Sequence, residues 1–485
     1  MARIQGGIRG RVVGRVAGVA FVVGVLGLGW AGQAAWRVWP SSPHAALPAL
    51  PAVSAAPAPL PAIALSWIED PPRSRERFEL ARQQAGRTDP FAAQRLVEWL
   101  DPVGPGSFRR LGEKPSEAST PSQGGGLLRV EYSLDERLTE NVFEIFRRGR
   151  VKRGLAIVLD PRSGRLLAYV ATDPETLPPE RAYPAASIVK ILTAATLLQE
   201  APVEAALPCV YRGNKYRLSP RKLARPPSGR ETSLEEALAT SNNQCFSQWA
   251  VHVLGEESLR ASIARFGWLV PPAPGHAAGR VEPISTNLQL GRLGSGLAGV
   301  WLNPLHVAAL ASVLTDGRLI EPWWIDRVVD SRGRSLELPR RAAERRVLTP
   351  QIARRLRSML VATTTTGTAK RAFRTRRGRP LLPGIAVAGK TGNLTGGDPF
   401  GRYEWFFGLA PAEDPTIAVV VLQVQSNLWW SRSSELAAKV LHSVFCEAKR
   451  CRPDLADRWT GELDDWTDPL LISERTRPQQ IARAH

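Results

Sequence analysis

Cysteine and histidine are scarce in this sequence, with four cysteines and six histidines among 485 residues. The cysteines form no paired Cys-x-x-Cys motifs, and the histidines are scattered along the chain. Structural and catalytic metal sites are built from clusters of these residues. We therefore expect no metal site and predict no cofactor.

The chain also lacks a compact basic motif, although its net charge is +19. The excess is mostly arginine and is scattered along the chain. A nucleic-acid-binding strip would instead have basic residues interleaved with aromatic residues. We expect no nucleic-acid partner. A basic protein that faces anionic lipid or cell-wall polymer fits the same charge.

Charged residues are absent from Val16 to Trp36, whereas Arg3, Arg9, Arg11 and Arg15 precede this stretch. A membrane-spanning helix needs about 20 apolar residues, and positive charge before it favours a cytoplasmic N-terminus. We predict a cytoplasmic stub and single-pass anchor over residues 1–36, with the rest of the chain exported. A cleaved signal peptide is the alternative, but the apolar stretch is long for a signal peptide and residues 31–35 match a cleavage site poorly.

Two further segments precede the part that carries recognisable chemistry. Residues 37–65 are rich in proline and alanine and are predicted to be an extended linker. Residues 66–126 form a small N-terminal region of unknown role, with one predicted helix from Phe78 to Leu100.

The most informative stretch is Ala185 to Ala195, where Ser187 and Lys190 stand three residues apart in an apolar, alanine-rich run. Positions i and i+3 share one face of a helix, so the lysine amine can lie beside the serine hydroxyl. Apolar neighbours lower the pKa of a lysine toward the range where it accepts a proton. Ser219 and Lys222 have the same spacing, but they lie among arginines and prolines, where the lysine would stay solvated and protonated.

Two further motifs follow in order. Ser241 and Asn243 form a Ser-x-Asn motif, and Lys390-Thr391-Gly392 follows a strand-like run. Ser-x-x-Lys, Ser-x-Asn and Lys-Thr-Gly are together the motif set of penicillin-binding proteins and serine β-lactamases. The chain therefore resembles the transpeptidase domain of a penicillin-binding protein, monofunctional and membrane-anchored.

The resemblance extends over residues 127–450. It includes a hairpin from Ala156 to Val170, Pro304-Leu305 at the start of a helix, Gly367-Thr368-Ala369, and a strand from Trp405. It implies an α+β fold: a five-stranded antiparallel sheet built from both ends of the domain, flanked by helices, with an inserted all-helical subdomain. Helices are expected at 135–148 and 434–449, strands at 127–133, 384–392, 403–409 and 416–424, and a charged tail at 451–485.

The same resemblance assigns roles to the motif residues. Ser187 would be the nucleophile and Lys190 its general base. Ser241 would pass a proton to the departing D-alanine, and Lys390 nearby would hold the charge balance of this network. The expected substrate-binding residues are Asn243, Thr391, Gly392 and Asn393. The backbone N–H groups of Ser187 and Asn393 would form the oxyanion hole.

One residue departs from the family pattern. Asn393 stands where the family usually has threonine or serine, so its backbone N–H is kept while the side chain that helps to bind the substrate carboxylate is changed.

The resemblance implies a D,D-transpeptidase of the cell inner membrane. Its catalytic domain would be periplasmic, cross-linking peptidoglycan stem peptides and acylated by β-lactams. Other cell-wall synthesis or division proteins are expected partners. A D,D-carboxypeptidase or endopeptidase, and a catalytically weak scaffold or β-lactam sensor, remain open. A β-lactamase is less favoured, because Asn243 breaks the Ser-x-Val pattern of one class.

The four cysteines would lie in an oxidising compartment if this topology is right. Cys446 and Cys451 are near enough at a helix end to bridge, which would leave Cys209 with Cys245. Buried free thiols are the open alternative.

Overall fold

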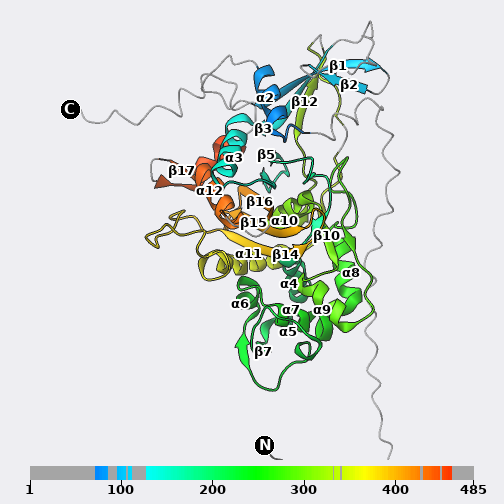
Figure 1. Ribbon diagram of the computed structural model, residues 1–485, viewed down its shortest axis with the longest axis vertical. Coiled ribbons are helices and arrows are strands. Elements are labelled where there is room, and N and C mark those ends of the chain that lie inside the picture. The colour runs from blue at the N-terminus through cyan, green and yellow to red at the C-terminus, as the bar shows by residue number, and fades with distance from the viewer. Residues whose placement is uncertain are drawn as a thin grey trace, which may run out of the picture. The chain divides into compact units, whose positions relative to one another are not determined.

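The centre of the fold is a five-stranded sheet in the order β14-β15-β16-β4-β5, with every neighbouring pair antiparallel (Figure 1). Its strands are β4 (Gly154–Leu159), β5 (Leu166–Ala171), β14 (Ala388–Gly396), β15 (Gly401–Ala410) and β16 (Ile417–Gln425). Strands from both ends of the domain thus meet in one sheet, which confirms the expected fold class. The computed structural model describes residues 71–85, 95–104, 107–111, 127–330, 333–338, 341–425, 430–447 and 450–460.

Helices cover both faces of this sheet. All six positions of β4 and of β5 are buried, as expected for strands with helices on either side. Helices α3 (Glu136–Arg148) and α12 (Ser433–Phe445) pack against each other on one face, and α10 (Pro304–Asp316) and α11 (Pro350–Thr365) pair on the other. Asp135 caps α3 by accepting a hydrogen bond from Leu138 N at 2.8 Å.

The insertion between β5 and β14 is mostly helical, but it also contains short strands. Its other helices are the 3₁₀ turns η1 (Ala186–Ile188) and η2 (Pro220–Lys222), the π-helical η3 (Ala250–Leu254), α4 (Val189–Glu200), α5 (Pro202–Ala206), α6 (Leu234–Ala239), α7 (Asn243–Trp249), α8 (Gly255–Arg265) and α9 (Asn287–Ser295). The short strands pair as β6 (Tyr183–Pro184) with β10 (Val300–Leu302), β10 with β9 (Arg280–Val281), β7 (Cys209–Tyr211) with β8 (Arg230–Thr232), and β11 (Arg318–Leu319) with β13 (Arg345–Arg346).

A second, four-stranded sheet joins the N-terminal region to the rest. Its order is β12-β3-β1-β2, formed by β1 (Arg95–Gly104), β2 (Ser107–Arg110), β3 (Leu128–Asp135) and β12 (Ile325–Val329). Helix α2 (Arg75–Gln84) packs on β1. The boundary expected between residues 126 and 127 therefore falls between strands of one sheet.

The helix predicted from Phe78 to Leu100 is wrong in its second half. The helix ends at Gln84, and residues 95–100 belong to β1, where the side chain of Glu98 is fully buried. Arg77 binds Glu98 through two hydrogen bonds of 2.6 and 2.8 Å, and the Tyr132 hydroxyl donates to it at 2.7 Å. The sequence contained a signal against one continuous helix, because Pro90 falls within the predicted range and proline is unfavourable inside a helix.

The closing helix is shorter than predicted. Helix α12 ends at Phe445, and the chain continues as a small hairpin of β17 (Cys446–Glu447) and β18 (Arg450–Cys451). The turn η4 (Pro453–Ala456) and α13 (Asp457–Thr460) follow. Among the described residues, no helix has both the length and the apolar character needed to cross a bilayer. The span predicted at 16–36, the linker at 37–65 and most of the tail at 451–485 lie outside the described residues.

Candidate active site

Ser187 and Lys190 lie where the turn η1 leads into α4. Lys190 Nζ lies 2.8 Å from Ser187 Oγ, 2.8 Å from Asn243 Oδ1 and 2.5 Å from the backbone oxygen of Ser295. A neutral amine has two N–H donors and one lone pair. These three neighbours suit that count as well as the three N–H donors of an ammonium group, because the oxygens of Asn243 and Ser295 accept, while the serine hydroxyl can donate or accept.

The surroundings favour the neutral form of Lys190. Its side chain is fully buried, and burial lowers its pKa well below the ordinary value. The positive charge of Lys390 lowers the pKa of Lys190 further. Lys190 can therefore accept the proton of the serine hydroxyl.

Lys390 supplies the second buried amine of the site. It donates hydrogen bonds to Ser241 Oγ at 3.1 Å and to the backbone oxygen of Thr391 at 2.9 Å. Burial lowers the pKa of Lys390 to about 7. A group that titrates near neutral pH is suited to exchanging protons with the hydroxyl of Ser241.

The backbone is strained beside both serines. Ala186 has φ +47° and Ser241 has φ +56°, in the left-handed region that residues with a side chain rarely adopt. Gly296 packs against the first of these residues: a Cβ atom there would lie 2.0 Å from the oxygen of Ala186. Helix α9, which ends at Ser295, thus fixes both the turn before Ser187 and one acceptor for Lys190, a contribution that no sequence motif indicated.

Thr368 links the second and third motifs. Its hydroxyl lies 2.6 Å from that of Thr391, and its backbone N–H donates to the oxygen of Ala239 at 3.1 Å. Gly367 permits this approach, since a Cβ atom there would lie 2.3 Å from the same oxygen. Sequence reasoning noted this Gly-Thr-Ala segment but gave Thr368 no role.

The amide of Asn243 is engaged inside the protein. While Oδ1 faces Lys190, Nδ2 donates to the backbone oxygen of Tyr216 at 2.8 Å. Asn243 therefore holds Lys190 in place. Its role in binding the amide of a peptide stays a prediction.

At Gly392, the strand β14 comes close to the turn η1, which contains Ser187. A Cβ atom at Gly392 would lie 3.3 Å from the Cβ of Ala186 and 3.4 Å from Cγ1 of Ile188, which leaves little room for a side chain between the strand and the turn. At Asn393, the side-chain Oδ1 accepts a hydrogen bond from Arg402 Nε at 2.9 Å. The asparagine that departs from the family pattern thus holds a cation beside the end of the Lys-Thr-Gly strand. The oxyanion-hole role of the Ser187 and Asn393 backbones stays a prediction.

The sequence model of the family described as "Penicillin binding protein transpeptidase domain" matches residues 154–445, more than half of the chain. The chain belongs to the penicillin-binding protein transpeptidase family. Peptidoglycan D,D-transpeptidase PbpA of Mycobacterium tuberculosis is 27% identical over 380 residues, covering 68% of this chain and 74% of the relative. Stage V sporulation protein D of Bacillus subtilis is 25% identical over 300 residues, covering 55% of this chain and 44% of the relative.

Solved structures of penicillin-binding proteins share the fold. The crystal structure of PBPA from M. tuberculosis superposes with a TM-score of 0.54 at 23% identity, covering 65% of this chain and 81% of that one. The imipenem acyl-enzyme complex of penicillin-binding protein A from M. tuberculosis also has a TM-score of 0.54, at 24% identity, covering 67% and 80%.

Ser219, the other serine of this penicillin-binding protein with a lysine three residues later, makes no hydrogen bond through its hydroxyl to that lysine in the described structure. Ser219 precedes the 3₁₀ turn η2 and its side chain forms no capping hydrogen bond. The amine of Lys222 donates instead to the backbone oxygen of Asn214 at 3.3 Å. Of the two Ser-x-x-Lys pairs, only Ser187 and Lys190 lie within hydrogen-bonding distance of each other in the described structure.

All four cysteines of this penicillin-binding protein are joined in disulfides, Cys209 with Cys245 and Cys446 with Cys451. The first disulfide ties β7 to α7 two residues beyond Asn243. The second closes the hairpin after α12. Free thiols, the alternative that the sequence left open, are absent from the described residues.

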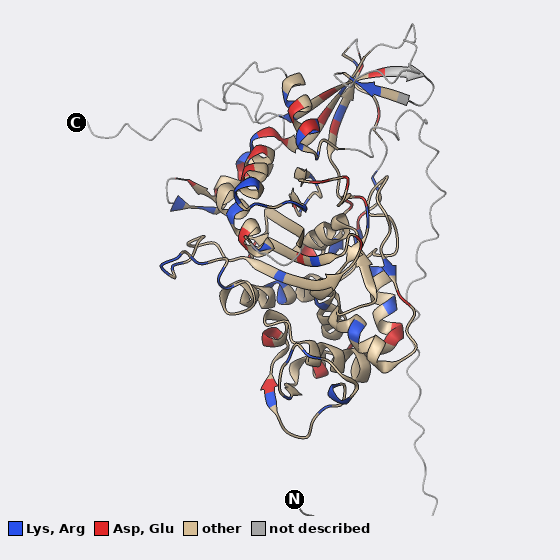
Figure 2. Ribbon diagram, in the orientation of Figure 1, with Lys and Arg blue, Asp and Glu red and all other residues tan. Residues whose placement is uncertain are grey.

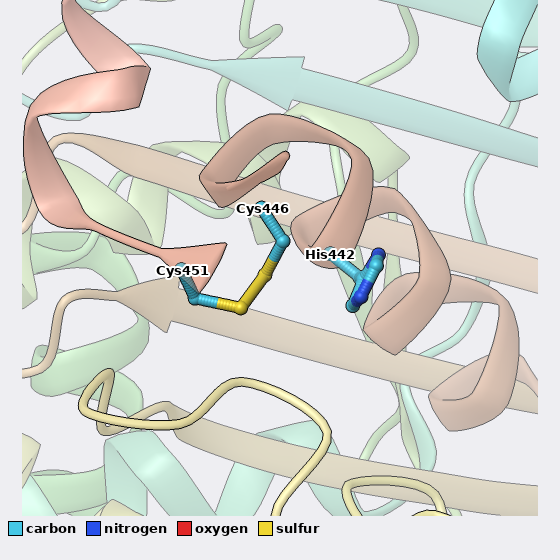
Figure 3. A group of neighbouring side chains, drawn as sticks. All are labelled: His442, Cys446 and Cys451. Carbon is cyan, nitrogen blue, oxygen red and sulfur yellow. A yellow bond between two sulfur atoms is a disulfide. The ribbon is translucent and has the colours of Figure 1, made fainter. Parts of the chain in front are cut away.

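His442 lies beside the second disulfide, and one of its ring nitrogens and the two sulfur atoms are within 4.8 Å of one another (Figure 3). A disulfide sulfur is not the thiolate that binds a metal ion, so this group offers one nitrogen ligand. A tetrahedral metal site takes three or four protein ligands. The cluster is therefore not a metal site.

Proposed function

We propose that this protein is a serine D,D-transpeptidase that cross-links peptidoglycan and is acylated by β-lactams. The observation that carries the proposal is the buried amine of Lys190, which lies 2.8 Å from the Ser187 hydroxyl and donates its other two hydrogen bonds to Asn243 and Ser295. Family membership and the similarity to PbpA, which is named a peptidoglycan D,D-transpeptidase, support the same activity.

In the first half of the reaction, Ser187 Oγ attacks the carbonyl between the two D-alanines of a stem peptide, and Lys190 takes the hydroxyl proton. The negative charge that develops on the carbonyl oxygen would be stabilised by the backbone N–H groups of Ser187 and Asn393. The C–N bond then breaks, a proton passes through Ser241 and Lys390 to the leaving amine, and D-alanine departs. The product is an ester between the peptide and Ser187.

In the second half, an amine of another stem peptide attacks the ester carbonyl. The new C–N bond forms, the C–O bond to Ser187 breaks, and the amine proton returns to Ser187 Oγ through Lys190. A β-lactam enters the same sequence, but its amide bond lies in a ring, so the leaving nitrogen stays attached to the acyl group and the second half is obstructed.

Covalent labelling tests the proposal. We expect the full-length protein to bind one fluorescent penicillin per chain, and a pentapeptide ending in D-alanyl-D-alanine to slow the labelling by competing for Ser187. Labelling is measured by gel fluorescence and by intact mass. An unlabelled protein that is otherwise folded would contradict the proposed function.

We also propose that the protein is anchored in the inner membrane by residues 16–36, with residues 37–65 as a spacer and the catalytic domain outside the cytoplasm. The arginines before the uncharged stretch support this orientation. Two disulfides are typical of an oxidising compartment and support export. Peptidoglycan stem peptides and other cell-wall synthesis or division proteins are the partners proposed there.

A reporter fused after residue 66 tests this topology. Because the positive residues precede the uncharged stretch, we expect alkaline phosphatase at this position to be active and a cytoplasm-dependent fluorescent protein to be dark. The opposite pattern would overturn the proposed localisation.

A further inference from the structure

The start of helix α7, which carries the motif residue Asn243, is held by a segment that precedes it in the chain. The backbone N–H groups of Asn243 and Gln244 donate to the oxygen of Lys215 at 3.0 and 3.3 Å. The side-chain Nδ2 of Asn243 donates to the oxygen of Tyr216 at 2.8 Å. The first N–H groups of a helix have no partner within the helix, so this segment supplies an acceptor that they need. The position of Asn243 therefore depends on where the backbone of Lys215 and Tyr216 lies.

Gln244, the next residue of α7, holds the same segment from its other side. Its Nε2 donates to the oxygens of Arg212 and Asn214 at 2.9 and 2.7 Å, and its Oε1 accepts from the N–H of Arg212 at 3.3 Å. The side chain of Gln244 is buried, whereas those of Arg212 and Asn214 are exposed. An amide both donates and accepts, and Gln244 uses both functions on main-chain groups of the segment.

A disulfide fastens the start of this segment to the same helix. Cys209 in β7 is bonded to Cys245, which follows Gln244 in α7, and both cysteines are buried. We call this bond the β7–α7 disulfide. A cross-link restricts the conformations that the joined segments can adopt. Two consecutive residues of α7, directly after the motif residue, thus fix residues 209–216.

The charge of the loop that joins β7 to β8 makes such a tether useful. Residues 212–229 contain four arginines and two lysines and no acidic residue. Figure 2 shows blue residues along this loop at the lower end of the view. Like charges repel one another and favour an extended chain. Arg225 binds Glu204 at 2.9 Å, but this ion pair lies beyond the segment that holds α7.

We propose that the β7–α7 disulfide and Gln244 are positioning elements of the active site, and that they promote acylation by holding Asn243 against Lys190. The oxygen Oδ1 of Asn243 accepts a hydrogen bond from Lys190 Nζ at 2.8 Å, and the same amine lies 2.8 Å from Ser187 Oγ. A shift of Asn243 removes one of the groups that orient the amine toward the nucleophile. The inference rests on the proposed function, because it concerns acylation of Ser187. Disulfides persist in oxidising compartments, so the site is fully positioned only where this bond can form.

A double-mutant cycle tests whether the disulfide acts through Asn243. The rate of acylation by fluorescent penicillin, per folded chain, is measured on four full-length proteins: the wild type, Cys209→Ala/Cys245→Ala, Asn243→Ala, and the protein with all three changes. We expect loss of the disulfide to lower the rate about tenfold in the wild-type background and less than about twofold in the Asn243→Ala background, because residues that act through one another are not additive. An equal fall in both backgrounds would show a general effect on the fold and overturn the proposal.

The pH profile of acylation gives a second readout. An acceptor stabilises the charged form of an amine, so loss of the Asn243 acceptor lowers the pKa of Lys190 further. We expect the acid limb of the profile to move to lower pH both in Cys209→Ala/Cys245→Ala and in Asn243→Ala. A disulfide variant with the wild-type profile would contradict the link to Asn243.

Cys446→Ala/Cys451→Ala is the matched control. It makes the same substitutions in the disulfide that closes the hairpin after α12. We expect it to keep the wild-type rate and the wild-type pH profile. A fall as large as that caused by loss of the β7–α7 disulfide would overturn the proposal.

Gln244→Glu keeps the disulfide and so remains informative if the chain without the disulfide does not fold. Glutamate has nearly the same shape, but its carboxylate cannot donate to the oxygens of Arg212 and Asn214. We expect the acylation rate to fall about tenfold in the wild-type background and less than about twofold in the Asn243→Ala background. An unchanged rate in Gln244→Glu would contradict the proposal.

Labelling of the wild-type protein separates the two levels of the argument. If the wild-type protein is not labelled by penicillin, the proposed function fails. If it is labelled and the variants without the disulfide or Gln244 are acylated at the wild-type rate, the proposed function stands and only the positioning role fails.

Discussion

The Ser187→Ala variant is expected to lose covalent labelling by penicillin completely, because Ser187 supplies the oxygen that forms the ester bond. The hydroxyl of Ser187 faces the buried amine of Lys190 at 2.8 Å, and alanine removes the attacking oxygen without changing the backbone. Labelling should fall below detection, measured as the time course of fluorescence per folded chain.

Ser219→Ala is the matched control for this result, since Ser219 and Lys222 have the same spacing. We expect this variant to be labelled at the wild-type rate, because the amine of Lys222 binds the backbone oxygen of Asn214. Labelling that survives in Ser187→Ala and disappears in Ser219→Ala would reverse the assignment of the nucleophile.

Replacing Lys190 with glutamine is expected to lower the second-order rate of acylation about 10²- to 10⁴-fold, the contribution typical of a general base. Glutamine keeps a polar group near Asn243 and Ser295 but cannot accept the serine proton. The wild-type rate should also fall as the pH is lowered through the depressed pKa of Lys190, because the amine gains a proton and loses its lone pair. The variant should lack this titration.

Lys222→Gln serves as the control for Lys190→Gln, and stopped-flow acylation from about pH 5 to pH 9 is the measurement. A Lys190→Gln rate within a factor of about three of the wild-type rate would rule out Lys190 as the base. A variant that is slow but retains the wild-type pH profile would place the titrating group elsewhere.

Local sequence patterns were sufficient for much of the fold. The apolar runs of β4, β5 and β16 predict strands, the first two as a hairpin, and the stripe of Leu138, Val142, Phe143 and Phe146 predicts α3. The hydrophobic pattern gave a wrong prediction at β1, because the spacing of Leu96, Val97 and Leu100 suits a helix face as well as a strand. Pairing with β3, which is distant in sequence, decides the outcome.

The motifs located residues that the structure brings together, but not what positions them. Ser187 and Lys190 are neighbours in sequence, so helical spacing was sufficient to pair them. The acceptor at Ser295 and the packing of Gly296 come from a helix about one hundred residues further on, and no local signal links them to Lys190. The hydrogen bond from Arg402 to Asn393 likewise depends on the register between β14 and β15.

The sheet β12-β3-β1-β2 determines how the protein can be shortened. A fragment that starts at Leu127 would lose β1, so β3 would present open N–H and C=O groups along one edge, a feature that promotes association between chains. It would also lose Glu98, leaving the buried hydroxyl of Tyr132 without its acceptor. A fragment that keeps this sheet together with the helix α2 that packs on it therefore begins before Arg75, at the N-cap Ser74 or earlier, and not at Leu127. For crystallisation or inhibitor screening, the small N-terminal region belongs with the catalytic domain as part of its folding unit.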